Sequence, residues 1–163
     1  MKPEDILSPC LPTNYRGTQS RAYRDGKGRF LKYCQGGRPA GIKFEADILQ
    51  ELAESICFPD VYEVGSNYIL MEDLGDGEEI TNLEVVMRHA CTALEDMRKI
   101  GVHHNDLESS SNIVVRANVP CLVDFGRATR GDPRPGAYPD YILLLSLARR
   151  FMQGRAIAEL VNK

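Results

Sequence analysis

Short apolar runs bounded by turn residues dominate the first third of the chain, a pattern that is typical of β-strands. Two such runs lie within residues 22–34, on either side of the tetrapeptide Asp-Gly-Lys-Gly at residues 25–28, and an Asp-Gly pair is a strong hairpin signal. Two further strands are expected at residues 61–64 and 68–71, joined by a Gly-Ser-Asn turn. The first part of the chain is therefore predicted to form a β-sheet.

Apolar residues recur at helical spacing in three other segments. Over residues 44–56 they predict an amphipathic helix, which Pro59 is expected to stop. Residues 81–84 read Thr-Asn-Leu-Glu, a capping-box pattern that predicts a helix over residues 83–100. Residues 141–147 are apolar on nearly all sides of a helix, so we expect that helix to be buried.

The remaining segments complete the expected organisation. Two short strands are predicted at residues 113–115 and 121–123, and the acidic, glycine-bearing stretch at residues 72–79 is interpreted as a linker between two lobes. Strands come first and helices later, so the expected fold class is α+β with two lobes. Among the five cysteines, we expect Cys91 and Cys121 to be the most buried.

The net charge of −3 conceals a marked segregation of charged residues. Residues 1–44 carry a net charge of +6, residues 45–126 of −13 and residues 127–163 of +4. These segments are either ordinary solvated faces or, alternatively, a basic surface near a polyanionic ligand that faces an acidic patch elsewhere. The isoelectric point near 5.6 argues against nucleic acid as a partner.

The first residues and the cysteine spacing suggest the cellular compartment. Residues 1–10 lack the apolar segment of a secretory signal, and the longest apolar run, residues 142–145, is far shorter than a membrane span. The cysteines show neither zinc-ligand spacing nor a disulfide framework. We therefore expect a cytoplasmic or nuclear protein with no membrane partner.

Side chains that suit phosphoryl chemistry concentrate within residues 101–126. Asp106 lies in a polar loop after a helix, Asn112 follows six residues later, and Asp124 comes directly after an apolar strand. Carboxylate and amide oxygens in this arrangement suit a hard cation such as Mg²⁺. His-x-Asp-Leu or Asp-Phe-Gly alone is a weak signal, whereas both together, about 18 residues apart with an Asn between them, are specific.

In these motifs, His-Asn-Asp-Leu at residues 104–107, Asn112 and Asp-Phe-Gly at residues 124–126, the sequence resembles the protein-kinase-like superfamily. These motifs are most similar to those of its atypical and small-molecule branches, which include RIO-type kinases, aminoglycoside and choline phosphotransferases and fungal kinase-like proteins. The resemblance implies one minimal bilobal kinase-like domain over residues 1–163. Its N-lobe, about residues 1–74, would hold an antiparallel sheet and one helix, and its small C-lobe, about residues 75–163, would be mainly helical.

The resemblance also implies roles for individual residues. Lys32 would hold the α- and β-phosphates of ATP, with Glu45 as its ion-pair partner, and Asp106 would be the catalytic base. Asn112 and Asp124 would bind Mg²⁺. By the same resemblance, His104 would brace the Asp-Phe-Gly segment and Asp140 would hydrogen-bond the backbone of the catalytic loop. The implied nucleotide-binding positions are a reduced glycine loop at Gly17, Thr18, Gln19 and Ser20, the gatekeeper Met71, and the backbone of Glu72 and Leu74 beside adenine.

Three departures from the family pattern bear on activity. The glycine loop keeps one glycine where typical kinases have three, although small hydroxyl residues still let backbone N–H groups approach a phosphate. Asp106 and Asn112 are six residues apart where the family usually has five, so one residue among Ser109–Ser111 is expected to bulge. Asn105 replaces the arginine that receives an activation-loop phosphate in regulated kinases, so control by such a phosphate is not expected.

The first functional hypothesis is an ATP- and Mg²⁺-dependent phosphotransferase that moves the γ-phosphate to a hydroxyl acceptor. A protein Ser/Thr acceptor is favoured over a small alcohol, because the short C-lobe lacks room to enclose a small substrate; an aminoglycoside- or choline-like kinase stays open. The second hypothesis is a pseudokinase, a nucleotide-binding or partner-binding module. A third is an unrelated α+β domain in which the motifs occur by chance.

Overall fold

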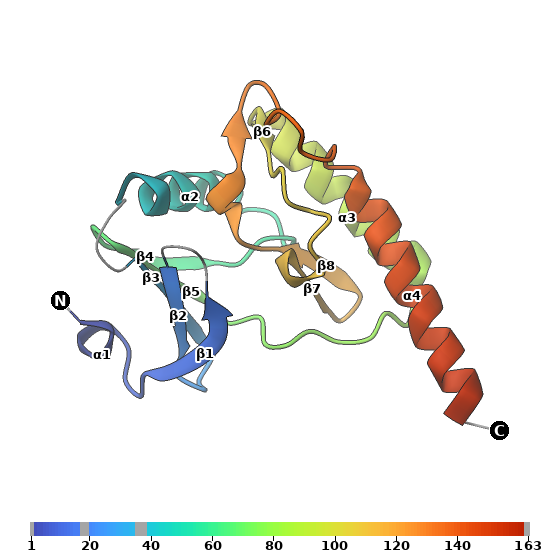
Figure 1. The fold of residues 1–163 in the computed structure, drawn as a ribbon, viewed down its shortest axis with the longest axis horizontal. Helices are drawn as coiled ribbons and strands as arrows, with labels where there is room; N and C mark the ends of the chain where they lie inside the picture. Colours follow the sequence, from blue (N-terminus) through green and yellow to red (C-terminus); the bar gives the residue numbers. More distant parts are fainter. Residues whose placement is uncertain (1, 17–19, 35–38, 162–163) are drawn as a thin grey trace. The chain divides into compact units, whose positions relative to one another are not determined.

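The computed structural model describes residues 2–16, 20–34 and 39–161, drawn in colour in Figure 1. The chain divides into two compact units. The first, here called the sheet unit, comprises residues 1–53 and 59–75; the second, the helical unit, comprises residues 54–58 and 76–163. Among the described residues, no helix combines the length and apolar character that crossing a bilayer requires.

The sheet unit is built around one five-stranded antiparallel sheet (Figure 1), which confirms the α+β class. The strand order is β1-β2-β3-β5-β4, and each neighbouring pair runs antiparallel. The strands are β1 (Leu11–Arg16), β2 (Ser20–Arg24), β3 (Arg29–Cys34), β4 (Val61–Val64) and β5 (Tyr68–Glu72). The helices of this unit are α1 (Pro3–Ile6) and α2 (Pro39–Glu51), of which α2 packs against β4 and β5.

Strand alternation separates the two faces of this sheet. Successive side chains of a strand point to opposite faces, and residues paired across strands share a face. Leu31 of β3 pairs with Leu70 of β5, and both belong to a buried cluster with Leu7. The next position, Lys32, pairs with Ile69, and it therefore lies on the other face, where it meets α2.

Helix α2 begins and ends about five residues earlier than its predicted range of 44–56. Pro39 stands at its start, where a missing N–H costs nothing. After Glu51 the chain turns, with the N–H of Leu52 shared between the carbonyls of Ile48 and Leu49. Residues 54–58 belong to the helical unit, where the carbonyl of Cys57 accepts a hydrogen bond from the N–H of Leu122. Cys57 and Phe58 are thus buried in the helical unit, whereas Ile56, predicted on the apolar face of α2, is 64% exposed.

The helical unit contains two long helices and two small antiparallel pairs. Helix α3 (Leu83–Lys99) packs against α4 (Ile142–Val161) and against β8. The two short strands predicted at residues 113–115 and 121–123 are β7 (Ile113–Arg116) and β8 (Val119–Leu122), which pair as a hairpin, and β6 (Val102–His103) pairs with β9 (Thr129–Arg130). Two 3₁₀ turns, η1 (Ser110–Asn112) and η2 (Phe125–Arg127), lie next to these strands.

Helix α3 begins at Leu83 as predicted, but its N-cap and the burial of Cys91 differ from the prediction. Its N-cap is Asn82, whose side chain accepts a hydrogen bond from the N–H of Val85 at 3.2 Å, whereas Thr81 hydrogen-bonds Asn118 instead. The buried positions are Val86, Ala90, Ala93 and Met97. Cys91 is exposed, so its expected burial was wrong; Cys121 is buried, but Cys57 is buried more completely, at 0% exposed against 4%.

Helix α4 is half-exposed, which corrects the prediction that it is buried all round. Leu143 and Leu147 are buried, whereas Leu145 and Met152 expose 50% and 64% of their surface. Residues 143 and 147 are four apart and share one side of the helix, the side that meets the rest of its unit. A uniformly apolar sequence allows a helix to be buried on all sides, but the number of helices and strands that pack against it decides how much of it is buried.

The turn between β2 and β3 is held by one carboxylate. Asp25 accepts hydrogen bonds from the backbone N–H groups of Lys27 (2.7 Å) and Arg29 (3.0 Å), and its second oxygen accepts from Nε of Arg29 (2.6 Å). Gly26 and Gly28 adopt positive φ angles that favour glycine. Burial opposes ionisation of Asp25, but these hydrogen bonds outweigh it and lower the pKa of Asp25 to about 2.

Replacing Asp25 with alanine is expected to lower the free energy of unfolding by roughly 1.5–3 kcal/mol at neutral pH, because hydrogen bonds to a charged acceptor are lost. The folded pKa lies below the ordinary value of 3.8, so this stabilisation is complete above about pH 4 and is lost as the pH falls toward 2. Denaturant unfolding of both proteins between pH 2 and pH 7 measures the difference. Asp47→Ala, which removes an exposed ion pair with Lys43, is the control and should cost under about 1 kcal/mol. A difference for Asp25→Ala that stays constant to pH 2 would contradict this role.

Candidate functional site

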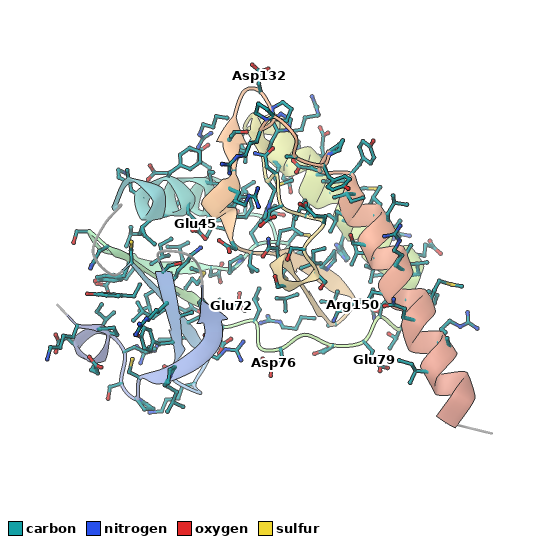
Figure 2. The ribbon with its side chains drawn as sticks, viewed as in Figure 1. Glu45, Glu72, Asp76, Glu79, Asp132 and Arg150 are labelled. Carbon is teal, nitrogen blue, oxygen red and sulfur yellow. The ribbon has the colours of Figure 1, made fainter. Side chains whose placement is uncertain are left out.

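In the sheet unit, Lys32 and Glu45 form a buried ion pair, as the family resemblance implies. The ammonium Nζ of Lys32 lies 2.7 Å from Oε2 and 3.0 Å from Oε1 of Glu45. The two residues expose only 5% and 2% of their surface. Strand β3 supplies the lysine and α2 the glutamate, which Figure 2 labels on that helix. A cation is thereby held at one defined point on the α2 face of the sheet.

The segment after β5 is fixed to the same sheet. Met71 is buried at the end of β5, and the N–H of Glu72 donates to the carbonyl of Asp60 at 2.8 Å. Beyond it, the carboxylate of Asp73 lies 3.2 Å from Nε of Arg24, and Leu74 is buried. The three positions predicted near adenine, Met71, Glu72 and Leu74, therefore lie in one short segment that is anchored to the sheet. Their contact with a nucleotide stays a prediction.

The predicted glycine loop is only partly within the described residues. Ser20 is the first residue of β2 and pairs with Cys34 of β3. Gly17, Thr18 and Gln19 lie outside the described residues. Their assignment to phosphate binding remains a prediction from the sequence.

In the helical unit, Asn112 is bonded directly to Asp106. Its amide Nδ2 donates to the backbone carbonyl and to Oδ2 of Asp106, both at 3.0 Å. The six-residue spacing is taken up by two successive turns: the N–H of Ser109 donates to the carbonyl of Asp106, and the N–H of Asn112 donates to the carbonyl of Ser109. Residues 110–112 thus form η1, and the side chain of Asn112 still reaches Asp106.

Asp124 stands at the end of the hairpin that Asn112 begins. Ile113 pairs with Leu122, and one step further the N–H of Val123 donates to the carbonyl of Asn112 at 3.0 Å. Asp124 follows in the left-handed region, with φ 61°, and its Oδ1 accepts from the N–H of Gly126. The hairpin register therefore brings the backbones of the two predicted Mg²⁺ ligands to one end of the hairpin.

These two side chains fit a hard cation in their chemistry. Asn112 uses its amide nitrogen on Asp106, which turns its carbonyl oxygen, the atom that binds metals, away from that contact. Asp124 offers carboxylate oxygens. Within the described residues there is no group of three or more His, Cys, Asp or Glu side chains that could hold a metal. A cation here would take few ligands from the protein and the rest from phosphate and water, as Mg²⁺ usually does.

His104 braces this region from inside the unit. Its Nε2 lies 2.9 Å from the carbonyl of Val123, and its ring packs on Phe125 with the centroids 4.5 Å apart. Burial disfavours the imidazolium and lowers the pKa of His104 below its ordinary value. The neutral ring donates its Nε2 proton to the carbonyl. This contact confirms the bracing role that the resemblance implies.

Asp140 receives the backbone of the same loop. Its Oδ2 accepts from the N–H of His104 at 3.0 Å, and its Oδ1 accepts from the N–H of Asn105 at 3.1 Å. Both hydrogen bonds were implied by the resemblance and are confirmed. One carboxylate, just before α4, thereby orients the two residues that precede Asp106.

Two arginines contact this region without having been singled out for it in the sequence. Nη1 of Arg127 lies 3.4 Å from Oδ1 of Asp106, so both carboxylate oxygens of Asp106 have a donor. Arg150 of α4, labelled in Figure 2, donates to the carbonyls of Ile113 and Glu78. The position of Arg127 directly after the Asp-Phe-Gly motif could have indicated its contact with Asp106. That of Arg150 is a long-range contact that no local pattern indicates.

Comparison with known proteins adds one distant relative. No family model matches this chain. A protein of Bacillus subtilis (strain 168) named "Putative serine/threonine-protein kinase YrzF" is 28% identical over 124 aligned residues. The match covers 63% of this chain and 57% of that protein, so the chain spans little more than half the length of this relative. The chain is thus similar, at low identity, to a protein that carries a kinase name.

Replacing Lys32 with methionine is expected to lower the free energy of unfolding by about 3–5 kcal/mol, because it leaves the Glu45 carboxylate buried without its counter-ion. The double variant Lys32→Met/Glu45→Leu should recover most of this loss, since an apolar pair of similar volume avoids burying a charge. Chemical denaturation of the four proteins of this double-mutant cycle tests the pair. Additive effects of the two substitutions would show that the pair is not coupled.

Replacing Asp140 with alanine is expected to accelerate amide hydrogen exchange at His104 and Asn105 at least tenfold, because both N–H groups lose their acceptor. Exchange followed residue by residue by NMR measures this. Glu84→Ala, which removes an exposed carboxylate from α3 of the same unit, serves as control and should leave both amides unchanged. Unaltered exchange at both amides in Asp140→Ala would contradict the anchoring role.

Proposed function

We propose that this protein is an ATP- and Mg²⁺-dependent phosphotransferase that moves the γ-phosphoryl group to a hydroxyl acceptor, with a protein Ser/Thr side chain as the favoured acceptor. The observation that carries the proposal is the braced loop of the helical unit, in which Asn112 holds Asp106 and the hairpin register brings Asp124 to the same end. The Lys32–Glu45 pair of the sheet unit and the similarity to a protein with a kinase name add support.

Each side chain has a defined task in this proposal. Asp106 orients the acceptor hydroxyl and takes its proton as the oxygen bonds to the γ-phosphorus, while the bridging oxygen leaves with ADP. Asn112 and Arg127 hold the Asp106 carboxylate in one orientation, since each donates to a different oxygen. Most of the rate would come from positioning and charge neutralisation, because phosphoryl transfer asks little covalent work of the protein.

The charged groups of the nucleotide have matching partners. Lys32, oriented by Glu45, would contact the α- and β-phosphates as a point charge. Asn112 and Asp124 would hold Mg²⁺, which when bound neutralises charge on the phosphates. Gly17, Thr18, Gln19 and Ser20 would approach the phosphates, and Met71, Glu72 and Leu74 would border adenine. The same proposal includes a protein Ser/Thr acceptor and a location in the cytoplasm or the nucleus.

One observation favours a second candidate, a pseudokinase that binds nucleotide or a partner without transferring phosphate. The guanidinium of Arg127 occupies Oδ1 of Asp106, and Asn112 occupies Oδ2, so the carboxylate that would accept a proton already has donors on both oxygens. Arg127 is 53% exposed at its side chain, which makes the contact replaceable by a substrate. Binding and transfer must therefore be measured separately.

The first experiment is a thermal-shift titration with ATP, with and without Mg²⁺. At 100 times its Kd, a ligand stabilises a protein by about 2.7 kcal/mol, which corresponds to roughly 5–10 °C in a chain of this size. Asp124→Asn should lose the Mg²⁺-dependent part; asparagine is preferred to alanine because it tolerates the left-handed backbone at this position. Glu84→Gln should shift like the wild type. No shift with any nucleotide would contradict the phosphotransferase and would favour the pseudokinase as a partner-binding module.

The second measurement is transfer of radiolabel from γ-labelled ATP to the protein itself, to dephosphorylated casein, and to choline and an aminoglycoside. Asp106→Asn should lower transfer at least a hundredfold while keeping the ATP-dependent thermal shift, because it removes the base and leaves the phosphate contacts. Labelled casein would support a protein acceptor. A labelled choline or aminoglycoside would show instead that the acceptor is a small alcohol. Nucleotide binding without any transfer would overturn the phosphotransferase in favour of the pseudokinase.

A further inference from the structure

The residue before the proposed base, Asn105, is buried in an unusual backbone conformation. It exposes 1% of its surface and has a φ of 64°, in the left-handed region that asparagine tolerates better than most residues. Its own N–H is fixed to Asp140. Burying a primary amide is costly unless its donors and acceptor are satisfied. The position therefore calls for an account of where these bonds go.

The amide of Asn105 is fully engaged by the segment that follows the Asp-Phe-Gly motif. Its Nδ2 donates to the carbonyl of Arg127 at 3.1 Å and to Oγ1 of Thr129 at 2.9 Å, with the carbonyl of His103 at 3.2 Å. Its Oδ1 accepts from the N–H of Arg134 at 2.9 Å. The nitrogen thus faces two backbone carbonyls and the oxygen faces an N–H, so the opposite orientation of the amide would be repulsive.

The hydroxyl of Thr129 agrees with this direction. Its single proton goes to the carbonyl of Asp132 at 2.7 Å, which leaves an oxygen lone pair to accept from Asn105. Thr129 carries the only hydroxyl group between Phe125 and Tyr138 in the sequence. A phosphate on Thr129 would remove the proton donated to Asp132 and would place charge where the amide now packs.

Among the described residues, other contacts hold the middle of this segment, including those of His103 with the carbonyl of Gly131 and of Arg130 with the carbonyl of Ile100. The two-residue ladder between β6 and β9 pairs Val102 with Arg130 and His103 with Thr129, and the N–H of Gly131 donates to the carbonyl of Gly101. Asn105 attaches the segment at residue 127, before the ladder, and at residue 134, after it. Its attachment at residue 127 bears on the site, because the side chain of Arg127 contacts Asp106.

We propose that Asn105 is a positioning residue that holds residues 127–134 in their ordered form without any added phosphate, so that Arg127 is presented to Asp106 in the unmodified protein. The effect on catalysis rests on the phosphotransferase proposed above, whereas the attachment itself does not. Asn105 thus supplies, through neutral hydrogen bonds, a link between the loop that carries Asp106 and the segment that follows Asp-Phe-Gly. The site is then assembled constitutively.

The attachment is tested by amide hydrogen exchange on Asn105→Gly. Glycine removes the side chain but accepts a positive φ without strain, so the backbone conformation is preserved. The amide of Arg134 should exchange at least tenfold faster, and residues 127–131 should lose protection with it. The matched control is Asn118→Gly, which removes another left-handed asparagine of the same unit whose side chain binds Thr81 and Asn82. It should leave residues 127–134 unchanged.

Wild-type protection of residues 127–134 in Asn105→Gly overturns the proposal, whether or not the protein transfers phosphate. If Asn105→Gly fails to fold, Thr129→Val provides the second test. It keeps the shape of the side chain and removes one acceptor of the Asn105 amide, and it should accelerate exchange at residues 127–134 while the helices α3 and α4 stay protected. Unchanged exchange in that variant likewise overturns the proposal.

The consequence for catalysis is tested by steady-state transfer to dephosphorylated casein. Asn105→Gly should lower kcat at least tenfold and change KM for ATP less than threefold, because the phosphate contacts proposed above lie elsewhere. Asn105→Asp should be worse than Asn105→Gly, since it sets a carboxylate against the carbonyls of His103 and Arg127. Wild-type protein shown by mass spectrometry to be unphosphorylated should be fully active, and an absolute need for phosphorylation would overturn the proposal. If the wild type transfers nothing, the phosphotransferase fails and the exchange experiment still decides the attachment.

Discussion

The geometry of the helical unit depends on the carboxylate of Asp140. It receives the N–H groups of His104 and Asn105, and from these two anchored residues the contacts divide. His104 reaches the carbonyl of Val123, next to Asp124, and Asn105 reaches the segment beyond residue 126. Asp106, the next residue, thus follows two residues whose backbone and side chains are both fixed by hydrogen bonds. A charged acceptor makes stronger hydrogen bonds than a neutral one, which suits an anchor that carries so many contacts.

The sheet unit solves a different problem, the burial of an ammonium group. Lys32 lies on the α2 face only because strand alternation places Leu31 and Tyr33 on the other face, in the cluster with Leu70. Glu45 then compensates the charge from α2. Pairs of this kind contribute little net stability compared with apolar residues of the same volume. The arrangement therefore places a buried cation on the α2 face of the sheet without a gain in stability that would explain it.

Local chemistry decides the parts of the structure that can be predicted from the sequence. The β2–β3 hairpin follows from Asp25 and its two glycines, and the pairing of Lys32 with Glu45 follows from strand and helix periodicity together with the family resemblance. The sequence does not predict the parts of the structure that depend on residues distant in the chain. The bounds of α2, the exposed Cys91 and the exposed side of α4 depend on which other elements are present to cover a residue. The contact of Asn105 with Arg134 spans 29 residues, and no spacing rule indicates it.

The two turns between Asp106 and Asn112 have a consequence for recognising such proteins. Each turn is closed by its own hydrogen bond, so the loop accepts an additional residue without altering the bonds from Nδ2 of Asn112 to Asp106. In this chain the donor–acceptor relation between Asn112 and Asp106 is made across an interval of six residues. A signature that prescribes a fixed interval overlooks this chain, whereas one written as required contacts with a variable interval includes it. Divergent sequences with a similar insertion are therefore better compared by their bonding pattern than by their spacing.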